Sequence, residues 1–515
     1  MNKKLVCTVL VFLNLVARGV AMPEVTKEKV KAALPKLAML ATQTLQKTGV
    51  PGLAIAVVYQ DEVVYLKGFG VREIGKPETV DADTVFQLAS VSKPLASTVV
   101  AALITDGKIT WDSRIADLDP TLQMYDPWVT REVTLRDLFA HRSGLPDHAG
   151  DLLEDLGYNR EEILYRLRYQ KSDSSLRAHY AYTNFGFTAA AVAAAKAAGK
   201  PWEDVAAEKL YQPLGMTQTN SRHADFDASL NHARLHVRVD GKWVAKYTRN
   251  PDAQSPAGGV SSSAGDMAQW LRLQLGTGKF EGKQVVDAEA LAETHRPQII
   301  REAPHNPATD SAGFYGLGWN VNYDDQTGVR LSHSGAFNLG AATAVVLLPA
   351  EALGIAVLSN GYPIGVPEAI SKSFLELALY GTVEQDWVDV FGPLFATLFK
   401  PDYGSAIDYN KPPSQPLSAL TSDAYIGTYH NDFFGELAVV AKDGGLVLQL
   451  GPHQTPLPLQ HYARDVFTYQ PVGENAAGSS AVTFMVDAAG KAMSIMIENL
   501  NIHGEGTFTR APTIK

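Results

Sequence analysis

The sequence has a single cysteine, Cys7, among its 515 residues. One thiol cannot form an internal disulfide, and structural zinc sites need several thiolate or imidazole ligands. Cys7 also falls in an N-terminal stretch that we expect to be cleaved off, which would leave the mature protein without a thiol. The sequence therefore excludes a cysteine nucleophile, a disulfide framework and a thiolate metal site.

Long apolar runs are scarce as well. Two lysines near the start precede a short apolar run, Leu5 to Ala17, and small residues follow at Gly19 to Ala21, which predicts a secretory signal peptide over residues 1–21. The run is too short for a comfortable membrane span, and no later stretch approaches the length of about 20 residues that a spanning helix needs. We expect a periplasmic or secreted protein with no stable membrane span; an uncleaved N-terminal anchor is the alternative interpretation.

The chain also lacks a surplus of basic residues. It has 45 Lys and Arg against 55 Asp and Glu, a formal net charge of −10, and no block of basic residues. Such a chain is a poor partner for nucleic acid, and we expect no nucleic-acid partner. The composition, 46% hydrophobic and 19% charged, is that of a globular protein long enough for one large domain and a smaller one.

Two common catalytic signatures are missing too. No Gly-x-Ser-x-Gly window occurs, so the nucleophile elbow of α/β-hydrolases is not supported. His232 and His236 stand four residues apart, as zinc ligands on a helix do, but no Glu-bearing metalloprotease motif accompanies them. We interpret both as capping or packing residues, interpret His141 as structural, and expect neither a metal nor another cofactor.

What the chain does have is a serine placed for activation. Ser90 and Lys93 stand three residues apart before an apolar run that predicts a buried helix, so their side chains share one face of its first turn. A buried lysine whose pKa falls from about 10.4 can accept the proton of a serine hydroxyl, and the N–H groups at a helix start suit an oxyanion. By itself the pair could equally be an N-cap serine and a solvated lysine.

Two further patterns supply matching groups. Tyr182 and Asn184 precede an alanine-rich helix; a tyrosine beside a lysine can be partly ionised and act as a general base, and an asparagine offers a donor and an acceptor to a substrate. His333-Ser334-Gly335 ends a predicted strand, where glycine lets the backbone approach an acyl group and the N–H of Ala336 can donate to an oxyanion. Together these residues form a candidate acyl-transfer site.

The order of the predicted elements indicates a mixed fold. A helix over 23–48 and a hairpin over 52–70 open the chain, helices dominate the middle, and strands return over 316–360 before a closing helix. This order predicts a sheet assembled from both ends of a domain and covered by helices. Four prolines within 400–418 indicate a linker, and the alternating strands after residue 425 predict a small antiparallel barrel or sandwich.

These motifs, in this order, resemble those of the class C serine β-lactamases and their relatives among penicillin-binding proteins, D-aminopeptidases and family VIII-type esterases. The resemblance extends over residues 30–382 and includes four supporting segments, Leu138–Pro146, Pro213–Met216, Pro256–Gly259 and Tyr315–Trp319. It implies an α/β (α+β) fold, a β-lactamase/transpeptidase-like domain over residues 22–385 with an antiparallel sheet flanked by helices. A linker over 386–418 and a lipocalin-like β-barrel domain over 419–515 would follow.

The resemblance also implies roles for the residues. The chain would be a secreted serine hydrolase of a small-molecule or peptide substrate. Ser90 would be acylated, Lys93 and Tyr182 would share the base role, and Asn184 would orient the substrate. The N–H groups of Ser90 and Ala336 would form the oxyanion hole. The barrel is expected either to shape the cleft or to mediate assembly into a homo-oligomer, as in some relatives.

One motif departs from the family. Where β-lactamases and carboxypeptidases usually have Lys-Thr-Gly, this chain has His333-Ser334-Gly335, and a histidine is mostly neutral at pH 7. The permanent cation that helps to hold a substrate carboxylate is therefore absent, which favours neutral esters, amides or peptides processed from the amino end over β-lactams. Esterase, D-amino-acid peptidase and β-lactamase-like activities stay open. The alternative to an enzyme is a non-catalytic penicillin-binding-like protein that binds peptidoglycan fragments or a partner.

Overall fold

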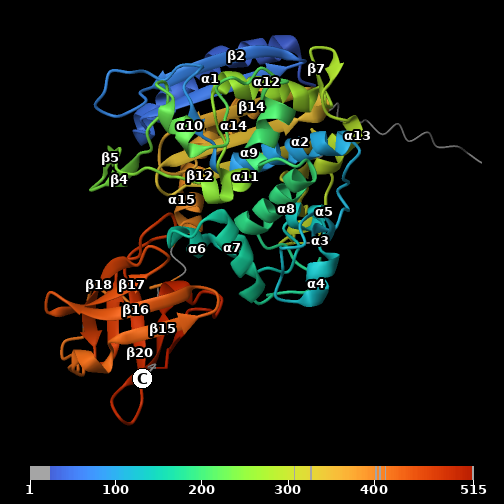
Figure 1. Ribbon diagram of the computed structural model, residues 1–515. Helices are drawn as coiled ribbons and strands as arrows, with labels where there is room; N and C mark the ends of the chain where they lie inside the picture. The colour runs from blue at the N-terminus through green and yellow to red at the C-terminus, as the bar shows by residue number, and fades with distance from the viewer. Residues whose placement is uncertain are drawn as a thin grey trace, which may run out of the picture.

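The computed structural model describes residues 24–306, 308–324, 327–400, 403–404, 407–411 and 413–512. In the larger part helices surround a wide sheet, and the C-terminal strands form a separate β-barrel beside it (Figure 1). This arrangement confirms the expected α/β domain followed by a small antiparallel barrel. The predicted signal peptide lies outside the described residues.

The sheet of the larger part has eight antiparallel strands. They are β1 (Gly52–Tyr59), β2 (Glu62–Gly70), β9 (Ile299–Glu302), β10 (Gly313–Tyr315), β11 (Asn320–Asp324), β12 (Gly328–Phe337), β13 (Ala341–Leu348) and β14 (Leu353–Ser359). Their order across the sheet is β2-β1-β14-β13-β12-β11-β10-β9. β1 and β2 form the predicted hairpin, whose turn residues Gln60 and Asp61 have φ of 49° and 65°. The chain thus builds its sheet from both ends.

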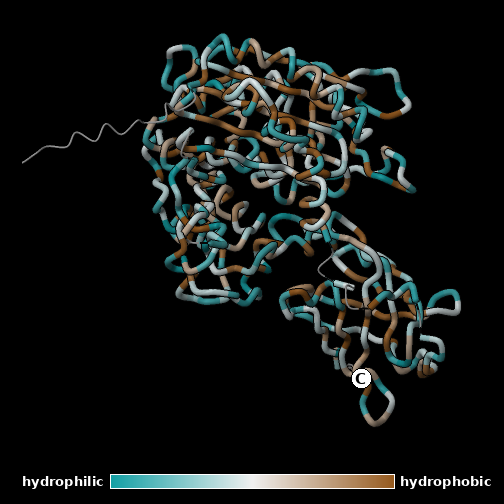
Figure 2. The backbone as a smooth tube through the Cα atoms, turned by 180° about the vertical axis from the view of Figure 1, so that it is seen from behind, coloured by the Kyte–Doolittle hydropathy of each residue, from teal (hydrophilic) through white to brown (hydrophobic). Residues whose placement is uncertain are grey.

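Two helices cover one face of this sheet. α1 (Lys27–Thr48) and α14 (Val366–Tyr380) pack against each other, and α14 lies over β13 and β14. Successive residues of β1 point to opposite faces, so Ile55 joins the core under these helices and Ala56 joins the core on the other side. Because both faces are covered, β1 is apolar throughout, and Figure 2 shows hydrophobic segments inside the larger part.

The helical region covers the opposite face. α12 (Ala264–Leu275) packs on β1 and β14, and α2 (Ser92–Thr105) is the buried helix predicted after Ser90. The other helices are α3 (Ile115–Leu118), α4 (Pro127–Glu132), α5 (Leu135–Phe139), α6 (Asp151–Asp155), α7 (Arg160–Arg166), α8 (Asn184–Ala197), α9 (Trp202–Ala206), α10 (His223–Ala228), α11 (Ser255–Gly258) and α13 (Ala288–Thr294). The short paired strands are β3 (Phe86–Gln87) with β6 (Ser261–Ser262), β4 (Val237–Val239) with β5 (Lys242–Val244), and β7 (Lys279–Phe280) with β8 (Lys283–Gln284).

Residues 386–418, which the sequence indicates as a linker, begin with a helix. α15 (Trp387–Leu398) packs on α14, and Lys47 of α1 pairs with Asp386 and Asp389 at its start. The four prolines that indicated a linker all follow this helix. They therefore mark only the later part of the stretch.

The C-terminal strands close into an eight-stranded antiparallel barrel. They are β15 (Gly427–Asn431), β16 (Gly435–Lys442), β17 (Gly445–Leu450), β18 (Thr455–Ala463), β19 (Val466–Tyr469), β20 (Ser480–Val486), β21 (Ala492–Ile497) and β22 (Thr507–Arg510). Buried aromatic rings fill the interior, including Tyr425, Tyr429, Phe467 and Phe484. The barrel was predicted from strand alternation; its likeness to lipocalins stays a prediction.

Polar contacts join the barrel to the larger part. The hydroxyl of Tyr158 donates to Phe434 O at 2.8 Å. The carboxylate of Asp155 accepts the N–H groups of Glu474 and Asn475, at 2.8 and 3.0 Å, and burial raises the pKa of Asp155 to about 7. The barrel loop between β19 and β20 is thereby tied to the end of α6.

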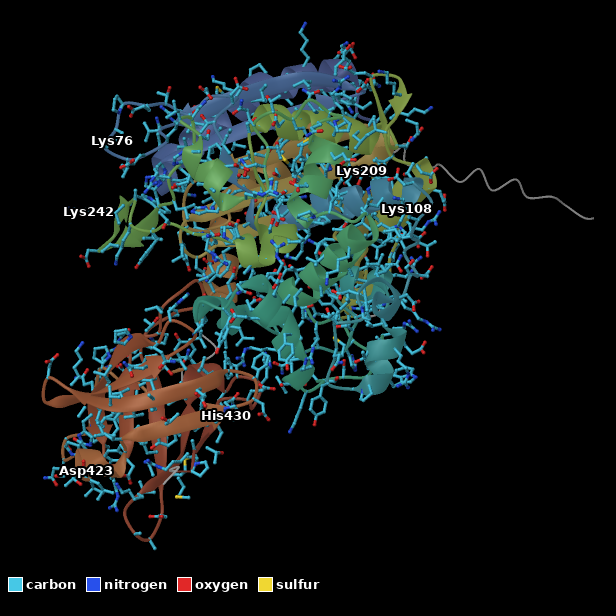
Figure 3. The ribbon with its side chains drawn as sticks, viewed as in Figure 1. Lys76, Lys108, Lys209, Lys242, Asp423 and His430 are labelled. Atoms are coloured by element: carbon cyan, nitrogen blue, oxygen red, sulfur yellow. The ribbon has the colours of Figure 1, made fainter. Side chains whose placement is uncertain are left out.

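Charged side chains lie mainly at the surface. Lys76, Lys108 and Lys242 are exposed and extend from the edge of the molecule (Figure 3). In the part of the chain that the structure describes, no helix is both long and apolar enough to cross a membrane. Unlike these exposed lysines, Lys93 has a fully buried side chain.

Candidate active site

Ser90 lies in a short 3₁₀ turn, Ala89–Val91, directly before α2. Ala89 has φ of 47°, a left-handed conformation that is unfavourable for alanine. The carbonyl of Leu88 accepts a hydrogen bond from Thr343 Oγ1 at 2.6 Å, which ties the turn to β13. The strained turn is thus held by the sheet, with Ser90 at its centre.

Lys93 is buried in the first turn of α2. Its Nζ lies 3.2 Å from Ser90 Oγ and hydrogen-bonds Asn184 Oδ1 at 2.7 Å and Ala257 O at 3.0 Å. Burial lowers the pKa of Lys93 to about 7, against the opposing charge of Asp151. Roughly half of this lysine is therefore neutral at pH 7 and able to accept a proton.

Tyr182 approaches the same hydroxyl from the segment before α8. Its OH donates to Ser90 Oγ at 2.7 Å, and Lys93 Nζ lies 4.4 Å from its ring centroid. Desolvation raises the pKa of Tyr182 well above its ordinary value. The phenol keeps its proton at neutral pH, so the partial ionisation expected from the sequence is wrong. The cost of burying a phenolate outweighs the attraction of a lysine that is itself only partly charged.

The amide of Asn184 connects Lys93 to a carboxylate. Asn184 accepts from Lys93 through Oδ1 and donates through Nδ2 to Asp151 Oδ2 at 2.8 Å. Asp151 Oδ2 also lies 2.8 Å from His148 Nδ1. The His148 side chain is about half exposed, and partial desolvation opposes its imidazolium form. The hydrogen bond and charge of Asp151 outweigh this effect and raise the pKa of His148 to about 9. The carboxylate fixes the orientation of the amide, which in turn holds Lys93 in place.

Two histidines considered from the sequence have structural contacts. His141 is buried, accepts the N–H of Thr183 at Nδ1 (3.1 Å) and packs its ring 4.6 Å from that of Tyr182. Burial lowers the pKa of His141 well below its ordinary value, so it is neutral. His236 Nδ1 lies 3.0 Å from Asn360 O. Among the described residues, no group of three or more His, Cys, Asp or Glu is arranged to hold a metal ion.

β12 passes beside Ser90 with a free edge. Its pairing with β11 ends at Ser332, so residues 333–337 pair with β13 on one side and with no strand of the described chain on the other. A Cβ at Gly335 would lie 2.1 Å from Leu88 O and 3.1 Å from Ser90 N, so only glycine permits this approach. The free edge offers backbone donors and acceptors to an extended substrate next to the serine.

Comparison with known proteins now identifies the family. Residues 37–378 match the sequence model of the family described as Beta-lactamase. The chain belongs to the β-lactamase family. Residues 411–509, which include all of the barrel strands except the last residue of β22, match a domain of unknown function (DUF3471).

Similar proteins include hydrolases and penicillin-binding proteins. An unguisins hydrolase (ungD) of Aspergillus violaceofuscus is 23% identical over 469 residues, covering 83% of this chain and 81% of the relative. Penicillin-binding protein 4 of Amycolatopsis lactamdurans is 28% identical over 323 residues, covering 61% and 81%. The D-alanyl-D-alanine-carboxypeptidase/endopeptidase AmpH of Escherichia coli is 23% identical, covering 62% and 81%. The octameric penicillin-binding protein homologue from Pyrococcus abyssi shares the fold, with a TM-score of 0.60 at 18% identity over 90% of this chain and 98% of that one.

Within this β-lactamase fold, four predicted residues form one hydrogen-bonded group. Ser90, Lys93, Tyr182 and Asn184 are joined by direct hydrogen bonds. Gly335 joins them through its backbone, because it lies against the N–H of Ser90.

The other predicted residues of β12 lie differently. Burial lowers the pKa of His333 to about 3; its Nδ1 lies 2.7 Å from Ser334 O and its Nε2 3.0 Å from Tyr315 OH. It is a neutral group, so this position supplies no cation. Ser334 and Ala336 alternate to the opposite face of the strand. On that face, Ser334 and Glu368 line a cavity of 320 Å³. Burial raises the pKa of the Glu368 carboxyl group to about 7.

Sequence reasoning missed two residues of the β-lactamase-like site, His148 and Asp151. Both lie at the entry to α6, where His148 and Gly150 have φ of 57° and 96°. Neither residue belongs to a periodic pattern or to one of the motifs. The concentration of charge directly after the Leu145-Pro146 turn is the one signal that could have indicated them.

Proposed function

We propose that this chain is a serine hydrolase that forms an acyl-enzyme on Ser90 and hydrolyses ester or amide bonds. The observation that carries the proposal is that Ser90 Oγ contacts a possible base and a possible acid. Lys93, about half of it neutral at pH 7, lies at 3.2 Å, and the protonated hydroxyl of Tyr182 lies at 2.7 Å. A base and an acid on one hydroxyl are what acyl transfer needs. Membership of the β-lactamase family supports the same chemistry.

In the acylation step, neutral Lys93 accepts the hydroxyl proton as Ser90 Oγ bonds to the carbonyl carbon. The π electrons move to the carbonyl oxygen, which the N–H groups of Ser90 and Ala336 stabilise. When the intermediate collapses, the bond to the leaving group breaks and Tyr182 donates its proton to that group. The proton held by Lys93 then replaces it on the phenol. Water repeats the attack on the acyl carbon and frees the serine.

The site favours neutral substrates. A neutral His333 cannot attract a substrate carboxylate, and the neighbouring Ser334 stands beside the carboxyl group of Glu368. We therefore expect neutral esters and amides, including peptides processed from the amino end, to react faster than β-lactams.

Covalent labelling tests the acyl-enzyme directly. A fluorophosphonate or a fluorescent penicillin is expected to add its mass to the peptide that contains Ser90, and Ser90→Ala should abolish the label. Ser418→Ala, at an exposed serine, is the matched control and should label fully. Unlabelled wild-type protein that still binds peptidoglycan fragments would contradict the enzyme and favour the binding protein.

A substrate panel tests the substrate class. Hydrolysis rates on p-nitrophenyl esters, D-alanyl anilides and nitrocefin separate esterase, peptidase and β-lactamase activity. We expect the esters or anilides to exceed nitrocefin in kcat/KM. Nitrocefin as the best substrate would contradict the argument from His333.

We also propose that the chain is exported and that it assembles into a homo-oligomer. If the signal is cleaved after residue 21, N-terminal sequencing of the exported protein should begin at Met22; a start at residue 1 would indicate a retained anchor. The similarity to an octameric homologue favours a homo-oligomer, which light scattering of the purified protein can test. A monomeric mass would contradict it.

A further inference from the structure

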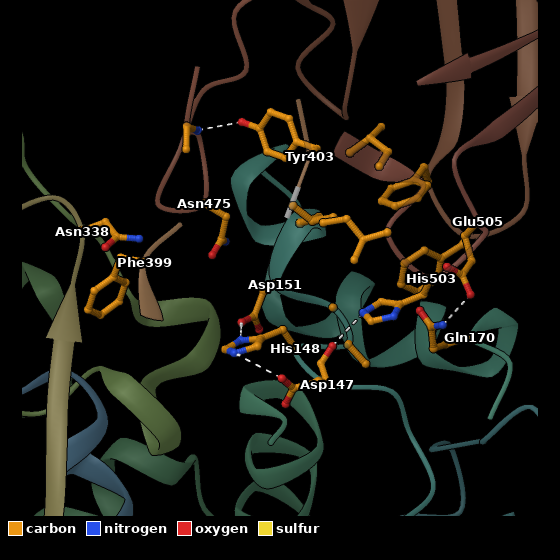
Figure 4. Close-up of a pocket in the computed structure, with 18 of the residues that line it drawn as sticks. Asp147, His148, Asp151, Gln170, Asn338, Phe399, Tyr403, Asn475, His503 and Glu505 are labelled. Atoms are coloured by element: carbon orange, nitrogen blue, oxygen red, sulfur yellow. Dashed lines mark hydrogen bonds and ion pairs between the residues drawn. The ribbon is translucent and has the colours of Figure 1, made fainter. Parts of the chain in front are cut away.

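A cavity of 240 Å³ lies between the larger part and the barrel, beside the candidate active site (Figure 4). Residues 147–152 form one wall, and barrel segments around Phe433, Asn475 and His503 close the other side. This volume suits one group of side-chain size rather than a drug-sized ligand. The cavity is therefore shaped for a part of a substrate.

Asp151 connects the cavity to the catalytic network. It lines the cavity and accepts a hydrogen bond from Asn184, which accepts one from Lys93. His148 stands in the same wall, with its ring centroid 5.5 Å from that of Tyr182. A group bound in the cavity thus lies next to the residues that surround the reacting hydroxyl.

Asn338 connects the cavity to the free edge of β12. It lines the cavity and directly follows residues 333–337, the edge that runs past Ser90. The barrel holds it in place, because its N–H donates to the carboxylate of Glu474 and its Nδ2 donates to Glu474 O at 3.2 Å. A substrate extended along this edge from the serine would bring its next group into the cavity.

The lining is mainly apolar, with two unpartnered acceptors. Its larger apolar side chains are Leu152, Leu398, Phe399, Phe433, Phe434, Leu500 and Ile502. Asp151 Oδ1 and Asn338 Oδ1 are buried and receive no hydrogen bond from any described residue. Asp151 as a whole is only 5% exposed. Several other polar residues of the lining are paired; Gln170, for example, donates to Glu505 at 2.6 Å.

Two buried acceptors in an apolar cavity require a donor, because a buried oxygen without a hydrogen bond costs free energy. We propose that the cavity is a substrate subsite, shared by both domains, for an apolar group that carries an N–H on the acyl side of the scissile bond. Asp151 and Asn338 would accept from an amide or an ammonium. The cavity is lined by groups of both charge signs: three carboxylates, one lysine and two histidines. The charge of the lining therefore excludes neither a neutral amide nor a cationic ammonium. This inference rests on the proposed hydrolase function.

Three p-nitrophenyl esters that differ at one position test the donor. The 3-phenylpropanoate, phenylalanine and N-acetylphenylalanine esters present a hydrogen atom, an ammonium and an amide N–H at the same carbon. We expect kcat/KM to be at least about tenfold higher for one or both nitrogen-bearing esters, and Asn338→Leu to remove most of this preference. The preferred ester identifies the donor. Equal values for all three esters would overturn the assignment.

Filling the cavity from the barrel side tests its location. Ile502→Trp adds bulk to the lining, and Met493→Trp, at a half-exposed position of β21 that does not line the cavity, is the matched control. We expect the kcat/KM ratio of the nitrogen-bearing ester to p-nitrophenyl acetate to fall about tenfold in the first variant and to stay at the wild-type value in the second. An unchanged ratio in Ile502→Trp would overturn the subsite.

p-Nitrophenyl acetate separates the two proposals, because its methyl group is too short to extend into the cavity. The hydrolase function fails if the wild-type protein does not hydrolyse this ester, or if Ser90→Ala hydrolyses it equally well. If that hydrolysis is present and the ester ratio of Ile502→Trp equals that of the wild type, only the subsite fails.

Discussion

Replacing Lys93 with methionine should abolish activity and remove a pH dependence from the stability of the fold. The pKa of Lys93 falls from 10.5 to about 7 on folding. Below pH 7 both states are protonated and the buried ammonium carries its full desolvation cost. Between pH 7 and 10.5 the unfolded chain keeps the proton that the folded chain has lost, so stability rises with pH. Methionine removes this dependence.

The size of this stability effect follows from the pKa shift of Lys93. At about 1.4 kcal/mol per pKa unit, the buried amine costs about 5 kcal/mol at pH 6 and about 2 kcal/mol at pH 9. Methionine leaves Asn184 Oδ1 and Ala257 O without a donor, which costs about 1–3 kcal/mol each at any pH. This pH-independent loss, about 2–6 kcal/mol in total, is comparable to the gain at pH 6, so the net change at a single pH is not diagnostic. The difference between the two pH values, about 3 kcal/mol, is the signature of the buried lysine.

Urea unfolding followed by tryptophan fluorescence, at pH 6 and pH 9, measures this difference. Lys31→Met, at an exposed position of α1, is the control and should change the unfolding free energy little at either pH. If Lys93→Met changes the unfolding free energy by the same amount at both pH values, the lysine does not titrate near 7. The assignment of Lys93 as a base at neutral pH would then be refuted.

Three other measurements test the site and its support. In the wild type, kcat/KM for p-nitrophenyl acetate should rise with pH through a midpoint near 7, because only neutral Lys93 accepts the serine proton; a flat profile from pH 5.5 to 8.5 would contradict this. Tyr182→Phe should lower kcat by about 10²–10⁴-fold with little change in KM, as measured by steady-state kinetics. Asp137→Ala removes a fully buried carboxylate that pairs with two arginines and should cost about 3–5 kcal/mol in urea unfolding. Glu62→Ala, which breaks an exposed pair, should cost less than about 1 kcal/mol.

The residues around the reacting hydroxyl could be predicted because each motif is local. Ser90 and Lys93 are three residues apart, and Tyr182 and Asn184 are two residues apart. Nothing in their spacing brings the two pairs together; the order of several motifs along the chain indicated that. The role of Asp151 was missed, because its hydrogen bond to Asn184 spans 33 residues and depends on how the loop before α6 packs.

Protonation states were harder to predict than positions. The sequence shows that Tyr182 can stand beside a lysine, and this proximity alone favours phenolate. Burial instead favours the protonated phenol, and burial depends on how the whole region packs. The linker shows the same limit. Its prolines are visible in the sequence, but the packing of α15 on α14 depends on a surface that only the folded domain provides.

Burial itself creates the acid and the base, which leads to a final prediction. It lowers the pKa of Lys93 and raises that of Tyr182, so one group accepts a proton and the other donates. Phe187 is fully buried with its ring centroid 5.8 Å from Lys93 Nζ. Phe187→Ala should admit water, raise the pKa of Lys93 by about one unit and lower kcat/KM about tenfold at pH 6, with recovery at pH 9. Phe187→Leu, which keeps the site dry, should retain the wild-type midpoint. An unchanged midpoint in Phe187→Ala would show that something other than desolvation lowers the pKa of Lys93.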